Sequence, residues 1–152
     1  MGLMTQYVEN KPVFALVDDH VHSARQLSRT LSAAPEPAFL VWLGGANRGK
    51  RILMEIFTAR PERTPDMVIV NLKGYSSASA EFIADIEKLV HNADIPIVAL
   101  ASTLDASTRN TLLAAGASAV FEHHADLDAY RREMAQLTRF WVRETATWPI
   151  RA

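Results

Sequence analysis

Residues 65–72 read PDMVIVNL, and this stretch decides the fold class of the 152-residue chain. Its central run, Met67–Val70, is apolar at every position and shows no alternation between apolar and polar residues. Such a run is typical of a strand that is buried on both faces, as in a parallel sheet. Asn71 follows at the expected carboxyl end of the strand, the edge at which α/β proteins gather their functional residues.

Similar apolar runs occur elsewhere along the chain, at Val13–Val17, Phe39–Leu43, Ile95–Ala101 and Ala119–Phe121. The segments that follow the runs carry apolar residues three and four positions apart, which is the spacing of an amphipathic helix. This alternation predicts an α/β fold with a five-stranded parallel sheet in a three-layer, doubly wound arrangement. We interpret residues 1–12 as an N-terminal extension and 13–148 as one domain, whose last helix covers about 126–146.

The composition excludes several classes of protein. Sixteen Lys and Arg residues against seventeen Asp and Glu residues give a net charge of -1, which does not favour direct binding of nucleic acid. The absence of cysteine excludes disulfide frameworks, thiol catalysis and cysteine-ligated zinc. No apolar run approaches the ~20 residues of a membrane span, and residues 1–12 contain no apolar signal core. We therefore expect a cytoplasmic protein that does not associate with a membrane.

Four motifs in order resemble those of the response-regulator receiver domain: FALVDD (Phe14–Asp19), PDMVIVNL (Pro65–Leu72), PIVALAS (Pro96–Ser102) and AGASAVFEH (Ala115–His123). The resemblance extends from about Val13 to about Arg143. It implies a flavodoxin-like fold with strand order 2-1-3-4-5. It also implies a role in bacterial two-component or phosphorelay signal transduction, with a kinase, an output domain or a regulator as the signalling partner.

The departures from the family pattern bear directly on its chemistry. In the family, an Asp on the third strand accepts a phosphoryl group, whereas Asn71 stands here and an amide cannot form the acyl phosphate. The family's Thr or Ser aligns with Ala101, and Ser102 is expected to point to the other side of the strand. The family's Lys aligns with His123. The chain therefore resembles a pseudo-receiver with a degenerate phosphorylation pocket, made of Asp18, Asp19, Asn71, Ala101, Ser102 and His123.

The acidic pair Asp18 and Asp19 has two interpretations. The resemblance implies a Mg²⁺ site that has lost one carboxylate, so that binding is weak and no cofactor is required. Alternatively, the pair is a solvated loop at the positive N-terminus of the next helix. His123 could add a nitrogen ligand for a transition metal, or could simply replace the lysine beside the acidic pair. For Asn71 we favour a buried amide whose hydrogen bonds are satisfied.

The segment Gly44–Lys50 reads GGANRGK and fits the pattern of a phosphate-binding loop between a strand and a helix. Arg51 stands where a Ser or Thr should bind Mg²⁺. A nucleotide-binding α/β switch or an enzyme that uses this loop is therefore the alternative function. The other interpretation is a glycine-rich turn with a basic surface.

The last predicted helix carries more apolar surface than one sheet edge can bury, which favours a partner or homodimer interface. Its first three turns are expected to pack one stripe, Leu127, Tyr130, Met134 and Leu137, on the sheet. The candidate interface residues are Tyr130, Met134, Leu137, Phe140, Trp141 and Trp148. On this interpretation, a chain that ends after Arg139 remains a folded monomer. The leading hypothesis is a binding module rather than an enzyme. It acts without phosphorylation, through the last two helices and the strand Ala119–Phe121.

Overall fold

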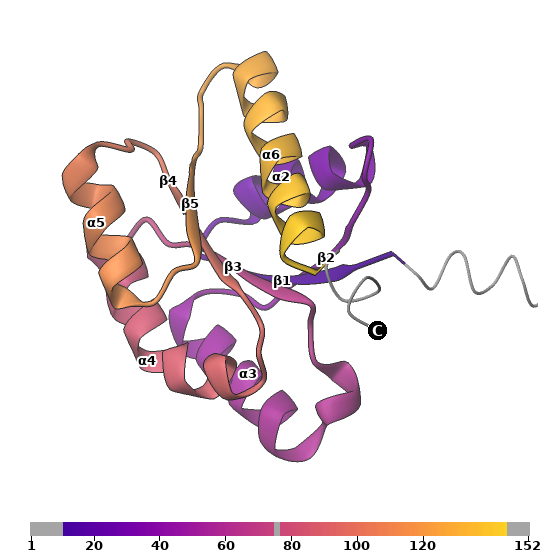
Figure 1. Ribbon diagram of the computed structural model, residues 1–152, viewed down its shortest axis with the longest axis vertical. Coiled ribbons are helices and arrows are strands. Elements are labelled where there is room, and N and C mark those ends of the chain that lie inside the picture. Colours follow the sequence, from indigo (N-terminus) through magenta and orange to yellow (C-terminus); the bar gives the residue numbers. More distant parts are fainter. Residues whose placement is uncertain (1–10, 75–76, 146–152) are drawn as a thin grey trace, which may run out of the picture.

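The computed structural model describes residues 11–74 and 77–145 and contains one five-stranded parallel sheet in the order β2-β1-β3-β4-β5 (Figure 1). The strands are β1 (Val13–Asp18), β2 (Phe39–Trp42), β3 (Met67–Asn71), β4 (Ile97–Ala101) and β5 (Ala119–Glu122). The helices are α2 (Val21–Ser32), α3 (Ala46–Ala59), α4 (Ala78–Asn92), α5 (Ala106–Ala115) and α6 (Leu127–Thr145), with a 3-10 turn η1 (Pro61–Arg63). The predicted fold class and strand order are confirmed.

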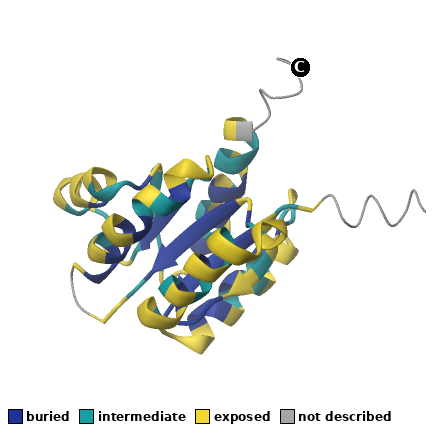
Figure 2. Ribbon diagram, turned by 90° about the horizontal axis from the view of Figure 1, so that it is seen from below, coloured by how far each residue is buried: buried dark blue, intermediate teal, exposed yellow. Residues whose placement is uncertain are grey.

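The helices form two layers, with α2 and α6 on one face of the sheet and α3, α4 and α5 on the other (Figure 1). In β1, Phe14 and Leu16 pack in the core on the α2 and α6 side, whereas Ala15 and Val17 pack on the opposite side. Successive side chains of a strand point to opposite faces, so a strand covered on both faces needs an unbroken apolar run. Figure 2 shows these central strands buried between helices whose outer faces are exposed.

The edge strand β2 departs from the prediction that all five runs are buried on both faces. In β2, 58% of Phe39 is exposed, and Val41 and Trp42 are exposed as well. In the described structure β2 pairs only with β1, so it lacks the flanking strand and the full helix cover that bury the central strands. An apolar run therefore marked the strand correctly but did not indicate its burial.

The inner face of α6 belongs to the core. Tyr130, Met134 and Leu137 are fully buried against the sheet and α2. These three side chains are therefore not surface residues available to a partner, which corrects their assignment to an interface. Leu127, which was expected to pack on the sheet with them, is instead exposed.

The far end of α6 is also held on the domain. The Phe140 ring lies edge-on to Phe121 with a centroid distance of 6.2 Å, and the Trp141 ring lies edge-on to Phe14 at 5.7 Å. The Trp141 indole also donates a hydrogen bond of 3.2 Å to the backbone oxygen of Asp66. Phe140 and Trp141 are thus half-buried packing residues, which argues against the folded monomer expected after truncation. Trp148 lies outside the described residues.

The start of α6 follows its sequence signal, because the Asp126 carboxylate accepts a hydrogen bond of 2.8 Å from the backbone N–H of Ala129. Within residues 11–74 and 77–145, no helix has both the length and the apolar character needed to cross a bilayer.

Candidate functional site

The predicted site residues meet at the carboxyl edge of the sheet. Asp18 and Asn71 are register partners at the ends of β1 and β3. The backbone N–H of His123 donates to the oxygen of Ala101 at 2.8 Å, which ties the ends of β5 and β4 together. We call the space lined by Asn71, Lys73, Ala101 and Ser102, with the adjoining Asp18 and His123 side chains, the strand-end pocket.

Asn71 is the centre of a buried hydrogen-bond network. It is 2% exposed, and its Nδ2 donates to Asp18 Oδ2 at 3.1 Å and to Ser23 Oγ at 3.1 Å. Asp18 is 0% exposed, and its Oδ1 accepts a hydrogen bond of 2.9 Å from the backbone N–H of His20. Both oxygens of a buried carboxylate thus have N–H donors, as burial of a charge requires. The burial of Asn71 and the two hydrogen bonds of its Nδ2 agree with the preferred interpretation of this residue as a buried amide.

Asp19 lies at the mouth of the pocket and is exposed. Its carboxylate accepts a hydrogen bond from the backbone N–H of Lys73, with a distance of 3.2 Å to Oδ2, and lies 3.1 Å from His20 Nδ1. Ligand atoms of Asp18, Asp19 and His20 lie within 4.8 Å of one another, so these residues form a candidate metal cluster. His20, which directly follows the acidic pair, thus supplies the nitrogen that sequence reasoning sought from His123.

The donor set of this cluster fits a divalent cation only in part. Mg²⁺ prefers an octahedron of oxygens, usually carboxylates and waters. Asp18 and Asp19 supply two carboxylates, whereas Asn71 directs an N–H donor, not an oxygen, toward Asp18. His20 suits a transition metal better than Mg²⁺.

Lys73 is a pocket residue that sequence reasoning missed. Its Nζ donates a hydrogen bond of 3.3 Å to Ser23 Oγ, so the Ser23 hydroxyl joins Lys73 to Asn71. The ammonium comes from the loop after β3, whereas the family pattern places its lysine after β5. A signal was present, because Lys73 is two residues beyond Asn71 in a segment expected at the same edge.

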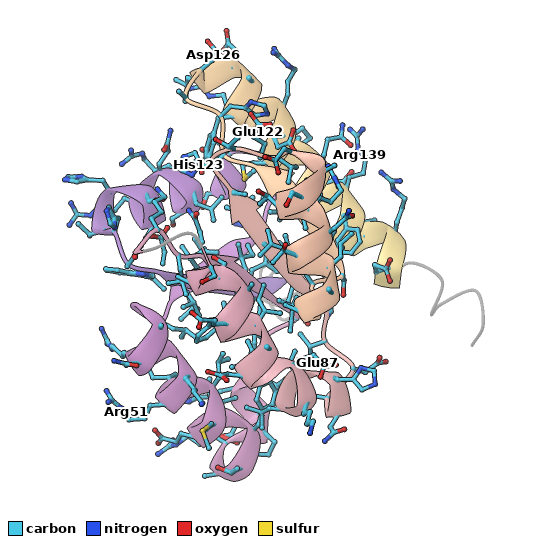
Figure 3. All side chains as sticks on the ribbon, turned by 90° about the vertical axis from the view of Figure 1, so that its left-hand side faces the viewer. Arg51, Glu87, Glu122, His123, Asp126 and Arg139 are labelled. Carbon is cyan, nitrogen blue, oxygen red and sulfur yellow. The ribbon has the colours of Figure 1, made fainter. Side chains whose placement is uncertain are left out.

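His123 and His124, which follow the end of β5, have different neighbours. The Nδ1 of His123 lies 3.5 Å from Asn71 Nδ2, and its ring lies 4.9 Å from the Tyr130 ring, centroid to centroid. His124 instead contacts carboxylates of Glu122 at 3.2 Å and Glu133 at 3.3 Å. Figure 3 shows His123 and Glu122 at one end of the molecule, below the start of α6 near Asp126.

Two aromatic side chains in this region have shifted acid–base properties. Burial lowers the pKa of His123 below its ordinary value of 6.5; the charge of Lys73 adds to this effect, and Asp18 partly offsets it. Burial raises the pKa of Tyr130 well above its ordinary value, and the Asp18 carboxylate adds to that rise. The buried Tyr130 hydroxyl has no hydrogen-bond partner among the described residues. The Thr30 side chain lowers the pKa of Tyr130 and so offsets part of its rise.

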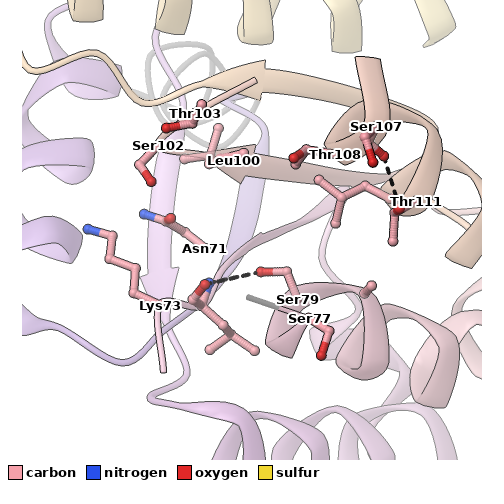
Figure 4. A pocket seen from close by; sticks show the side chains of 14 residues that line it. Asn71, Lys73, Ser77, Ser79, Leu100, Ser102, Thr103, Ser107, Thr108 and Thr111 are labelled. Carbon is pink, nitrogen blue, oxygen red and sulfur yellow. Dashed lines mark hydrogen bonds between the residues drawn. The ribbon is translucent and has the colours of Figure 1, made fainter. Parts of the chain in front are cut away.

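Ser102 differs from its predicted orientation. It was expected to point away from the site, but it lines the same pocket as Ala101, Asn71 and Lys73 (Figure 4). The reason is that β4 ends at Ala101, so the alternation of a strand does not extend to Ser102. The pocket is open, has a volume of about 570 Å³ and extends between α4 and α5. Its wall is rich in hydroxyl groups, supplied by Ser77, Ser79, Ser102, Thr103, Ser107, Thr108 and Thr111.

The segment Gly44–Lys50 does not form a phosphate-binding loop. Helix α3 begins at Ala46, so only Gly44 and Gly45 lie in the turn. Gly49 is inside the helix, where a Cβ atom would lie 3.0 Å and 3.1 Å from the two methyl carbons of Val17. The Lys50 ammonium lies 3.8 Å from a carboxylate oxygen of Asp85. Close packing of α3 on β1 therefore explains Gly49, and the nucleotide alternative loses its structural basis.

Comparison with known structures identifies the fold. No protein-family model and no curated protein sequence matches the chain. Response regulator RPA3017, from red light signaling of R. palustris, matches with a TM-score of 0.69 and 17% identity, over 86% of this chain and 93% of its own.

Two further structures are of the same kind. The Mn²⁺-bound form of response regulator Rcp1 matches with a TM-score of 0.68 and 17% identity, over 86% of this chain and 94% of its own. The phosphorylated cyanobacterial phytochrome response regulator RcpA matches with a TM-score of 0.67 and 16% identity, over 87% and 94%. The chain therefore has the fold of response-regulator receiver domains, with the amide of Asn71 at the end of β3.

Proposed function

We propose that the chain is an atypical receiver domain of a bacterial two-component or phosphorelay pathway, a pseudo-receiver that acts by protein contact without phosphorylation. The observation that carries this proposal is the position of Asn71 at the end of β3, where its amide donates to Asp18 and Ser23. A carboxamide is a poor nucleophile. The Nδ2 of Asn71 also donates to the buried Asp18 carboxylate and holds it in place, so Asn71 has a structural role in the pocket.

Groups of the chain itself partner the charged side chains of the strand-end pocket. The carboxylates of Asp18 and Asp19 accept hydrogen bonds from N–H donors. The Lys73 ammonium donates to the Ser23 hydroxyl, which also accepts a hydrogen bond from Asn71, so a positive charge lies near Asn71. We infer that the domain requires no cofactor. Mg²⁺ binds weakly at Asp18 and Asp19, because the site lacks a third carboxylate and lies near a resident cation. The Mn²⁺-bound form of Rcp1, a protein of the same fold, supports a residual cation site.

The proposed partners are proteins: a kinase, an output domain or a regulator, met in the cytoplasm. The proposal includes no catalytic activity of the domain itself and no direct contact with nucleic acid or a membrane. A homodimer through the last helix remains a prediction. Because Tyr130, Met134 and Leu137 are buried, such a dimer would have to use the outer face of α6. Light scattering on the full chain tests it.

The decisive experiment is treatment with acetyl phosphate and Mg²⁺, followed by intact-mass spectrometry at neutral pH. We expect no phosphoryl adduct on this chain, while a receiver that retains its acceptor Asp gains one in the same tube. A matched Asn110→Asp variant, altered at an exposed amide of α5, should also stay unmodified. A labile adduct on the unaltered chain would contradict the proposal.

A further inference from the structure

The strand-end pocket continues past Asn71 into an open cleft between α4 and α5, which we call the α4–α5 arm. Figure 4 shows Asn71 and Lys73 at one end of this cleft and the hydroxyl groups of Ser107, Thr108 and Thr111 at the other. The whole pocket has a volume of about 570 Å³, and leucine side chains supply its apolar part. Sites for small molecules in proteins span about 300–1,000 Å³, so a ligand of this kind fits.

The side-chain oxygen of Asn71 is an acceptor without a donor. Asn71 is 2% exposed, and its Nδ2 donates to Asp18 and Ser23, but no donor among the described residues reaches its Oδ1. In that part of the chain, the Tyr130 hydroxyl is the one side-chain polar atom that is both enclosed and unpaired. The Asn71 oxygen is therefore not enclosed and opens on the pocket that Asn71 lines. A ligand that pairs with it must bring an O–H or N–H donor.

The Lys73 ammonium supplies a positive charge next to this acceptor. Its Nζ donates to Ser23 Oγ at 3.3 Å, and the same hydroxyl accepts from Asn71 at 3.1 Å, so one hydroxyl separates the ammonium from the amide. Lys73 makes no ion pair within the described residues, and no Asp or Glu lines the pocket. These features favour an anionic ligand group at Lys73.

The charges around Asn71 limit the anion to a single negative charge. Lys73 offsets one charge, whereas the buried Asp18 carboxylate, 3.1 Å from Asn71 Nδ2, repels a second one. A phosphate dianion also carries no donor for the Asn71 oxygen. A 2-hydroxycarboxylate meets both requirements, because its carboxylate and its hydroxyl donor are on neighbouring carbon atoms.

The hydroxyl groups along the α4–α5 arm extend the same chemistry. Ser102 and Thr103 follow β4 at the near end of the arm, and α5 supplies further hydroxyl groups. A Ser or Thr hydroxyl both donates and accepts, so it pairs with a hydroxyl group of a ligand in either sense. Further hydroxyl groups on the ligand therefore match this wall better than an aliphatic chain does.

We propose that the α4–α5 arm is a non-covalent binding site for a small polyhydroxylated carboxylate, such as a sugar acid. The ligand's carboxylate accepts from Lys73 Nζ, its 2-hydroxyl donates to Asn71 Oδ1, and its other hydroxyls pair with Ser102 and the α5 wall. The inference goes beyond the proposed function and shares with it the premise that Asn71 is not phosphorylated. It assigns the amide at this position a recognition role in addition to its contact with Asp18.

The test titrates the ¹⁵N-labelled full chain with D-gluconate, without Mg²⁺, and follows amide chemical shifts. A titration to about 10 mM measures a Kd near 1 mM. We expect the largest shifts at the side-chain amide of Asn71 and the backbone amides of Ser102 and Thr103. Sorbitol, which lacks the carboxylate, and hexanoate, which lacks the hydroxyls, should each bind about tenfold more weakly, and inorganic phosphate should not exceed them.

Two variants with matched controls locate the ligand. Lys73→Met should weaken gluconate about tenfold and leave sorbitol unchanged, whereas Lys88→Met, at an exposed lysine of α4, should alter neither. Ser102→Ala should weaken both ligands about threefold. Ser118→Ala, at an exposed serine before β5, should have no effect. The dispersion of the amide spectrum checks that each variant is folded.

Four outcomes overturn the proposal. They are the absence of gluconate binding, shifts that gather outside the α4–α5 arm, binding of hexanoate or phosphate as tight as that of gluconate, and a Lys73→Met variant that binds gluconate like its control. The acetyl phosphate experiment measures a covalent adduct and does not depend on these titrations. The ligand site and the proposed function can therefore fail separately.

Discussion

The strand-end pocket and the open groove between α2 and α6, which is lined by Arg25, Arg29 and Arg131, both carry charged side chains. They differ in how those charges are paired. In the pocket, Asp18 is fully buried and is held by donors from His20 and Asn71. In the groove, Arg25 and Arg29 have no ion pair within the described residues. A site whose charges are already paired resists change, whereas unpaired charges at the surface are available to a partner. The function proposed above therefore looks for a partner at the surface rather than in the pocket.

The largest effect is expected where α6 is held on the sheet, because the groove exists only while that helix stays in place. The double variant Phe140→Ala with Trp141→Ala removes the contacts with Phe121 and Phe14. We expect the free energy of unfolding to fall by about 4 kcal/mol, as for removal of packed aromatic rings. Urea denaturation measures this loss. Arg139→Ala, a change at a neighbouring exposed residue, should cost less than about 0.5 kcal/mol. Equal stability of the two variants would show that the end of α6 is dispensable.

The next effect is the loss of pairing inside the pocket. Asn71→Leu removes the donor to Asp18 Oδ2 and leaves a buried carboxylate partly unpaired. We expect the free energy of unfolding to fall by about 3 kcal/mol. The matched change at an exposed amide, Asn110→Leu, should alter it by less than about 0.5 kcal/mol. If Asn71→Leu is tolerated as well as the control, the pocket is not held together by this network.

A smaller effect concerns the pH dependence of stability, which should differ between the buried pocket residue His123 and an exposed histidine. The pKa of His123 is lowered in the folded state, so the unfolded chain binds the proton more readily. The stability that depends on neutral His123 is complete above the ordinary pKa of 6.5 and is lost as the pH falls from there through the folded pKa.

His123→Asn removes this dependence. The stability of the unaltered chain relative to the variant should therefore fall between about pH 7.5 and pH 5. Thermal unfolding across this range measures it. His91→Asn, at an exposed position of α4, should parallel the unaltered chain. A pH dependence that is the same for all three proteins would mean that His123 does not titrate differently on folding.

The smallest effect concerns the cation. Lys73→Met removes the resident ammonium near Ser23, so Mg²⁺ should bind about fivefold more tightly, the effect of about 1 kcal/mol of charge repulsion. Calorimetric titration measures the Kd, with Asn71→Asp as a variant that restores the third carboxylate and should bind more tightly still. Lys88→Met on α4 is the matched control. An unchanged Kd for Lys73→Met would show that the lysine does not compete with the ion.

The site was predicted in part, and the predictions that failed share one physical cause. Asp18 and Asn71 could be placed together because parallel strands end at one edge of a sheet. Ser102 was assigned to the wrong side, since strand alternation stops where β4 ends at Ala101. Lys73 was missed because a long side chain from a loop can reach across a pocket in a direction that its backbone position does not reveal.

The last helix shows the same difference between what a local pattern predicts and where the side chains lie. Its apolar spacing predicted an amphipathic helix correctly, and its length agrees with the structure. Tyr130, Met134 and Leu137 were expected to pack on the sheet, and they are buried there. Their additional assignment to an interface does not fit this burial. Their burial depends on α2, which is about one hundred residues earlier in the chain and packs on the same face of the sheet.

The sequence by itself determined the alternation of strands and helices, the edge at which polar residues gather, and the amide at the end of β3. These follow from local rules, namely the periods of helices and strands and the identity of one residue. Only the tertiary structure decided that β2 is an exposed edge, that Lys73 enters the pocket, and that Arg25, Arg29 and Arg131 share one groove. Those outcomes depend on which distant segments become neighbours, and no local pattern encodes that.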